Sequence, residues 1–95
     1  MAVGDPVHYL VGANSGAYYY YQPAAGVEIL ITMCGSTAAA TKFSWYDGAI
    51  RVFFYESTGN QEQVLKCWIT NSVYLEMRQT TGVLQNVGFS GLQTK

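Results

Sequence analysis

Few side chains of this 95-residue chain could carry out chemistry: one histidine, two cysteines and six acids, all well separated. His8 could act as a general base, and Ser15 is the nearest serine that such a base could activate. No nucleophile elbow surrounds Ser15, and His8 alternates with apolar neighbours in residues 7–11, VHYLV. We therefore expect His8 to be a surface or interface residue and not a catalyst.

The acids form no pattern that is typical of an active site, which would bring two carboxylates together in one pocket. Asp47 belongs to a predicted turn, Glu56 and Glu62 flank another, and Asp5 lies near the beginning of the chain. No glycine-rich loop precedes a helix that could hold a phosphate group. We predict no catalytic residue and no enzymatic activity.

The two cysteines, Cys34 and Cys67, lack the close spacing of a metal or redox motif, and the chain has one histidine to add to them. We expect two buried thiols that behave as small hydrophobic side chains. The sequence therefore predicts no metal site and no cofactor.

Charge is scarce. Charged residues make up 12% of the chain, about half of the roughly 25% found in ordinary soluble domains. The basic residues stand singly and the net charge is −1, so no stripe could neutralise phosphates and we expect no nucleic acid partner. With so little charge to coat its surface, the chain must expose apolar area or cover it with another chain.

Residues 1–6 lack the basic and apolar regions of a secretory signal, and no apolar run approaches the ~20 residues that cross a bilayer. We expect a complete chain made in the cytosol, without a membrane partner. Residues 1–6 are expected to form a flexible or partner-contacting arm of a single domain that covers residues 1–95.

The ordered stretches alternate with period two and are rich in Val, Ile, Thr, Tyr, Phe and Trp, which is typical of β-strands. Glycine and small polar residues interrupt them at short intervals. We predict an all-β, single-domain antiparallel β-sandwich, or a jelly-roll-like pair of sheets, with seven or eight short strands.

The pair Asp47-Gly48 predicts a two-residue hairpin turn, because a type I′ turn needs positive φ at both positions. That turn would pair Trp45 with Ile50 and Phe43 with Val52 on the buried face. A second turn at Gly59-Asn60 would extend the same sheet. In that register Arg51, Phe53 and Tyr55 lie on the outer face, opposite Trp68, Lys66 and Val64.

Residues 16–23, GAYYYYQP, put four tyrosines in a row, and in a strand two of them must face away from the core. Tyrosine is favoured at protein interfaces because it joins a large rigid ring to a hydroxyl that can stay wet. We expect the outward pair to be Tyr19 and Tyr21, because Tyr21 adjoins Gln22-Pro23, where the strand leaves the sheet. The predicted interface residues are Tyr19, Tyr21, Phe53, Tyr55 and Trp68.

A short all-β chain that opens with MAVGDP, is rich in Gly, Thr, Asn and Gln and has no catalytic motif resembles the small capsid decoration (cement) proteins of tailed bacteriophages. Residues 69–78 and 89–95 have the same style. The resemblance implies a virion structural protein on the capsid surface. It also implies a homo-oligomer, most readily a trimer, that binds the major capsid protein and clamps the shell against the pressure of the internal DNA.

The alternative is a carbohydrate-binding, lectin-like module of a host-recognition appendage. Trp68, Tyr55 and the tyrosine run would supply a surface on which sugar rings stack. Asn60, Gln61 and Gln63 are the candidate polar cluster beside it.

Overall fold

The computed structural model of the protein describes residues 3–37, 39–59 and 61–95. Eight β-strands follow one another along the chain: β1 (Pro6–Ala13), β2 (Tyr18–Tyr21), β3 (Glu28–Ser36), β4 (Ala39–Tyr46), β5 (Arg51–Thr58), β6 (Gln61–Thr70), β7 (Tyr74–Gln79) and β8 (Gln85–Gln93). The described residues include no helix that is long and apolar enough to span a membrane.

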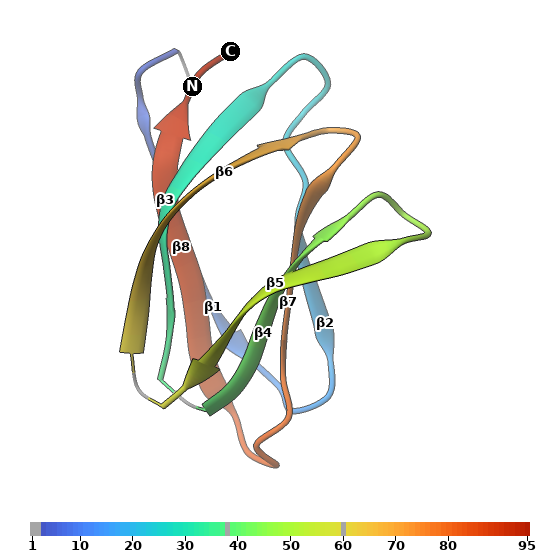
Figure 1. Ribbon diagram of the computed structural model, residues 1–95, viewed down its shortest axis with the longest axis vertical. Coiled ribbons are helices and arrows are strands. Elements are labelled where there is room, and N and C mark those ends of the chain that lie inside the picture. Colours follow the sequence, from blue (N-terminus) through green and yellow to red (C-terminus); the bar gives the residue numbers. More distant parts are fainter. Residues whose placement is uncertain (1–2, 38, 60) are drawn as a thin grey trace.

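The strands form two antiparallel sheets that pack face to face (Figure 1). Sheet A has the strand order β1-β8-β3-β6, and sheet B has the order β2-β7-β4-β5. The predicted all-β sandwich is confirmed. The chain passes between the sheets several times, so strands that are neighbours in sequence often lie in different sheets.

One apolar layer separates the two sheets. Sheet A contributes Ile29, Ile31 and Ile69 to it, and all three side chains are fully buried. Phe43, Leu75 and Met77 face them from sheet B and are buried to the same degree. Cys34 and Cys67 are both buried and free, as the sequence predicted. Burial raises the pKa of the Cys34 thiol to about 12, with a smaller contribution from Cys67.

The hairpin between β4 and β5 forms at the predicted place, but its predicted register is wrong by two residues. Trp45 pairs with Val52 and Tyr46 pairs with Arg51. The Asp47 carboxylate accepts hydrogen bonds from the backbone N–H groups of Ala49 and Ile50, at 2.9 and 2.7 Å, which widens the turn to four residues.

These two donors also hold the pKa of Asp47 below its ordinary value. A slip of two residues keeps each side chain on its face. However, the loop projects away from the body of the sandwich (Figure 1), which leaves Ile50 and Val52 exposed where the sequence placed them in the core.

The second predicted hairpin is wrong, because β6 leaves sheet B and pairs with β3 in sheet A. The pairs that the sequence predicted between β5 and β6, with Arg51, Phe53 and Tyr55 opposite residues of β6, therefore do not form. Of the predicted turn, Asn60 lies outside the described residues. A strand shows the same alternation of apolar and polar residues whichever sheet it joins. The sequence of β6 therefore does not indicate that the chain crosses to the other sheet.

A β-bulge in β5 turns Tyr55 inward, which corrects its predicted outward position. Ser44 pairs with Phe53, but Phe43 pairs with Tyr55, so Phe54 is the extra residue of the bulge. The Tyr55 ring stacks on Phe43 at 5.8 Å between centroids and packs against the core.

Part of the predicted N-terminal arm belongs to the sheet. The Gly4 N–H donates to the Gln93 carbonyl at 2.7 Å, and the Asp5 carbonyl accepts a bond from the Gln93 N–H at 3.1 Å. Pro6 then begins β1 opposite Leu92. Met1 and Ala2 lie outside the described residues.

Two phenylalanines of sheet B test which face is the core. Phe43→Ala removes a fully buried ring, and we expect it to lower the free energy of unfolding by ~3–5 kcal/mol. Phe53→Ala is the matched control, because Phe53 faces solvent; its expected cost is below about 1 kcal/mol. Urea denaturation measures both. Equal losses for the two variants would contradict the assignment of the faces.

Candidate functional site

The tyrosine run forms the edge strand β2, and the outward pair is Tyr18 and Tyr20, not Tyr19 and Tyr21. Tyr19 pairs with Met77 and Tyr21 pairs with Leu75. Directly opposed residues of an antiparallel pair share a face, and both of these partners are core residues. Tyr18 and Tyr20 are 42% and 41% exposed.

The inward pair completes the core. The Tyr21 ring contacts Phe89 and Tyr9 in sheet A, at 5.0 and 5.2 Å between centroids. The Tyr19 hydroxyl accepts a bond from the Asn14 N–H at 2.9 Å. The predicted orientation was wrong because the register of β2 against β7 is set by tertiary pairing, which residues 18–21 do not encode.

The outer face of sheet B carries a group of seven side chains that we call the tyrosine–arginine cluster. It consists of Tyr18 and Tyr20 of β2, Tyr46 of β4, Arg51 of β5, and Tyr74, Glu76 and Arg78 of β7. All four strands of the sheet contribute to it.

The ion pair between Arg51 and Glu76 lies at the centre of the cluster. Arg51 Nε donates to both Glu76 carboxylate oxygens, at 2.8 and 3.1 Å, and a terminal nitrogen donates to Oε2 at 3.0 Å. Glu76 is buried although it faces outward, because the Arg51 side chain reaches over it from the edge strand. A buried carboxylate needs such a partner, since unpaired it would lose its hydration without compensation.

The rings of the cluster are covered by cations and by one another. The Arg51 guanidinium lies 4.9 Å from the ring centroids of both Tyr18 and Tyr46, and Arg78 lies 4.8 Å from that of Tyr18. Tyr20 stacks nearly parallel to Tyr18 and to Tyr46, at 6.5 and 5.4 Å. Groups of the same chain thus cover part of each outward ring, and Tyr18 and Tyr20 remain exposed over the rest.

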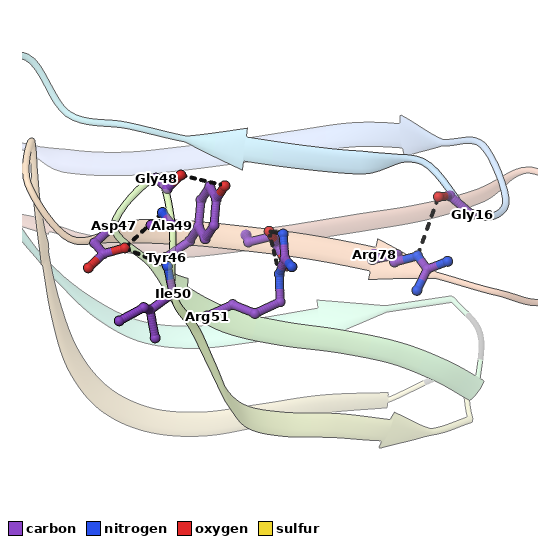
Figure 2. A network of polar contacts seen from close by, with 9 residues as sticks. Gly16, Tyr46, Asp47, Gly48, Ala49, Ile50, Arg51 and Arg78 are labelled. Carbon is purple, nitrogen blue, oxygen red and sulfur yellow. Dashed lines mark hydrogen bonds and ion pairs between the residues drawn. The ribbon is translucent and has the colours of Figure 1, made fainter.

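Hydrogen bonds hold this arrangement at both ends of the cluster. Figure 2 shows the Tyr46 hydroxyl donating to the Gly48 carbonyl at 2.9 Å and Arg78 donating to the Gly16 carbonyl at 3.3 Å. Gly48 has a φ of +99°, which a side chain would strain. These bonds tie Tyr46 and Arg78 to the backbone of neighbouring turns.

Ion pairing and burial shift the pKa values of two groups in the cluster. The Glu76 carboxylate is neutralised by Arg51, and its hydrogen bonds raise the pKa of Arg51 above its ordinary value. The pKa of Tyr20 is raised by burial and then by the charge of Glu76, while a hydrogen bond with Arg51 lowers it. Within the described part of the chain, no three His, Cys, Asp or Glu side chains come together in a way that could hold a metal ion.

The outer face of sheet A has a different character. Its exposed or half-exposed hydrophobic side chains form a group that we call the apolar face: Leu10, Leu30, Met33, Val64, Trp68 and Leu92. Leu30 is paired directly with both Trp68 and Leu92. A bulge between Ile31 and Met33 turns Met33 outward, although period-two alternation from Ile31 would place it on the core face.

A shallow trough crosses the apolar face. Gly88 and Gly35, which are paired, form part of its floor, and Leu10 and Met33 lie among its lining residues. Leu10 is 83% exposed, and Trp68 is 48% exposed. Such an apolar patch on a monomer usually marks a contact surface.

Of the predicted interface residues, Phe53 and Trp68 are exposed as expected, but the structure places them on opposite outer faces. Phe53 is on sheet B, where Lys42 lies 5.7 Å from its ring centroid. Val64 is exposed as predicted, but on sheet A, and Leu10 was missed as a surface residue. The alternation of Val7, Tyr9 and Val11 could have shown that Leu10 points to the other face.

The shifted pKa of Tyr20 has a consequence for stability. Folding holds the Tyr20 proton more tightly, so unfolding releases a proton at pH values between the ordinary tyrosine pKa of about 10 and the raised one. The free energy of unfolding should therefore fall as the pH rises through this window. Urea denaturation at several values from pH 9 to 11.5 should show a smaller fall for Tyr20→Phe. Equal pH dependence in the two proteins would contradict this.

No protein-family model matches the chain, and no curated protein matches its sequence.

Proposed function

We propose that the protein is a non-enzymatic structural protein that joins protein surfaces, as a homo-oligomer, in a larger assembly. The capsid shell of a tailed bacteriophage is the assembly that the resemblance implies, and the major capsid protein is the partner. The observation that carries the proposal is that exposed hydrophobic and aromatic side chains lie on both outer faces of one sandwich. A module with two opposed surfaces can bind two neighbours at once, as a cement protein must.

The residue types of the two outer faces differ, which suggests that each face binds a different partner. The apolar face carries Leu, Val, Met and Trp side chains, which is typical of permanent contacts between copies. The outer face of sheet B presents tyrosine and arginine, the residues most enriched at the energetic centres of protein interfaces. We assign the apolar face to contact between copies and the tyrosine–arginine cluster, with Phe53, to the shell.

Binding to the shell should depend weakly on salt. Arg51 and Glu76 neutralise each other, so the cluster has a net charge near that of Arg78 alone. Long-range attraction then contributes little, and the contact relies on the area and shape of the tyrosine rings.

The lectin-like alternative receives less support from this geometry. Sugars stack on exposed ring faces, whereas the faces of Tyr18, Tyr20 and Tyr46 lie against guanidinium groups or other rings. Tyr55 packs inward against Phe43. Trp68 keeps an exposed ring, so any sugar contact would be at the apolar face.

Co-sedimentation with shell particles tests the proposal. The particles are assembled from the major capsid protein of a tailed bacteriophage, and wild-type protein should pellet with them. The double variant Tyr18→Ser, Phe53→Ser should bind at least about tenfold more weakly, because it removes two exposed rings from the face assigned to the shell. Val83→Ser is the matched control, an exposed apolar residue in the loop between β7 and β8, and should bind like wild type.

Absence of wild-type protein from the pellet would contradict the proposal. Binding to a glycan array that is lost in Trp68→Ser, without binding to the shell, would establish the lectin-like alternative in its place.

A further inference from the structure

We propose that Arg78 and Lys42, on the outer face of sheet B, form a binding site for one carboxylate group. An Asp or Glu side chain of the shell protein supplies this group. The site rests on the proposed function, because it gives the chemistry that the face assigned to the shell recognises.

The pairing of the strands places four side chains in one row across the outer face of sheet B, which we call the cationic row. Tyr18 of β2 is paired with Arg78 of β7, and Glu56 of β5 is paired with Lys42 of β4. Arg78 and Lys42 are paired with each other at the centre of the sheet. Directly opposed residues have Cβ atoms about 4.5–5.5 Å apart, and like charges in this position destabilise a sheet. An anion bound to both cations would relieve this repulsion.

The two cations are each held by groups on the side away from the other. The Arg78 guanidinium lies 4.8 Å from the ring centroid of Tyr18, and its Nε donates to the Gly16 carbonyl at 3.3 Å (Figure 2). The Lys42 ammonium lies 5.7 Å from the ring centroid of Phe53. Tyr18 is on the edge strand β2 and Phe53 on the edge strand β5, so these contacts draw the cations toward opposite edges of the sheet. An anion can therefore approach between them.

Both cations have hydrogen-bond donors to spare. A guanidinium has five N–H groups and an ammonium has three. Among the described residues, Arg78 uses its Nε–H group and Lys42 uses none, and the ion pair that forms is between Arg51 and Glu76. Arg51 already donates through Nε and a terminal nitrogen to Glu76. Arg78 is half-exposed and Lys42 is exposed, so a partner can reach both.

The charge of the row favours a single carboxylate. Arg78 and Lys42 carry one positive charge each, and Glu56 at the end of the row leaves a net charge of +1. A guanidinium can bind a carboxylate through two parallel hydrogen bonds, and a lysine adds a point charge. A phosphate group carries about −1.5 to −2 charges near neutral pH, so this row would neutralise it incompletely.

The rings beside the two cations belong to the surface that we assign to the shell. Tyr18 and Phe53 are 42% and 52% exposed, and they lie on either side of the site. A partner that packs on these rings would exclude water from the carboxylate between them, which strengthens a charged contact. The net charge of +1 keeps long-range attraction small, in agreement with the weak salt dependence expected for the shell contact.

Side-chain NMR tests the site without the shell. The chain has two arginines, so its ¹H–¹⁵N spectrum contains two Nε–H signals. A triglutamate peptide with blocked ends should shift the Arg78 signal progressively, and a blocked triglutamine peptide at the same ionic strength should not. The Arg51 signal is the internal control, because its Nε–H already donates to Glu76. Lys42→Gln should weaken peptide binding about two- to fivefold, the effect of losing one exposed ion pair, whereas Lys66→Gln should not.

Co-sedimentation connects the site to the shell. Arg78→Gln should weaken binding to shell particles at least about fivefold, because it removes a charged contact that uses two hydrogen bonds. Lys42→Gln should weaken it about two- to fivefold. Lys66→Gln is the matched control, since Lys66 is an exposed cation on β6 of sheet A, and should bind like wild type. Urea denaturation of each variant checks that the fold is retained.

Equal shifts from the glutamate and glutamine peptides, or peptide binding that Lys42→Gln leaves unchanged, would overturn the carboxylate site. Inorganic phosphate that binds more tightly than the glutamate peptide at equal ionic strength would also overturn it. Shell binding that survives both Arg78→Gln and Lys42→Gln would overturn the site and leave the proposed function standing. Carboxylate binding by a protein that does not pellet with shell particles would overturn the proposed function and leave the site standing.

Discussion

The whole structure depends on the single apolar layer between two sheets. A strand places alternate side chains on opposite faces, so eight strands that bury one face in this layer must each present the other face outside. In a chain with 12% charged residues, those outer faces cannot all be coated with charge. The protein meets this constraint differently on each side of the sandwich.

On sheet B the constraint is met within the chain. Arg51 extends from one edge strand across the sheet, lies between the Tyr18 and Tyr46 rings, and reaches Glu76. One cation thereby pairs a buried carboxylate and covers two aromatic rings. The cation–π contacts and the charge-assisted hydrogen bonds support each other, because both require the same position and orientation of the Arg51 guanidinium. The tyrosines remain half-exposed, but in a fixed arrangement.

On sheet A no such cover exists among the described residues. Leu10, Trp68 and Leu92 stay exposed there, and both arginines of the chain lie in sheet B. The contrast between a face that covers itself and a face that does not underlies the division of contacts that we propose.

Local sequence patterns were enough to predict the all-β sandwich of seven or eight strands and the burial of Phe43, Cys34 and Cys67. Period-two alternation and turn residues are local, so they can be read without knowing which strands pair. The sequence also showed that aromatic side chains must face outward in more than one place, because no single core could bury both faces of a tyrosine run.

Which aromatic side chains face outward depends on the tertiary structure. The sheet that β6 joins, the bulges beside Phe54 and Met33, and the register of β2 against β7 each depend on contacts between residues far apart in sequence. Each one moves a side chain from one face to the other, or to the other sheet, without changing the local pattern. For that reason Tyr19, Tyr21 and Tyr55 were assigned to the wrong side.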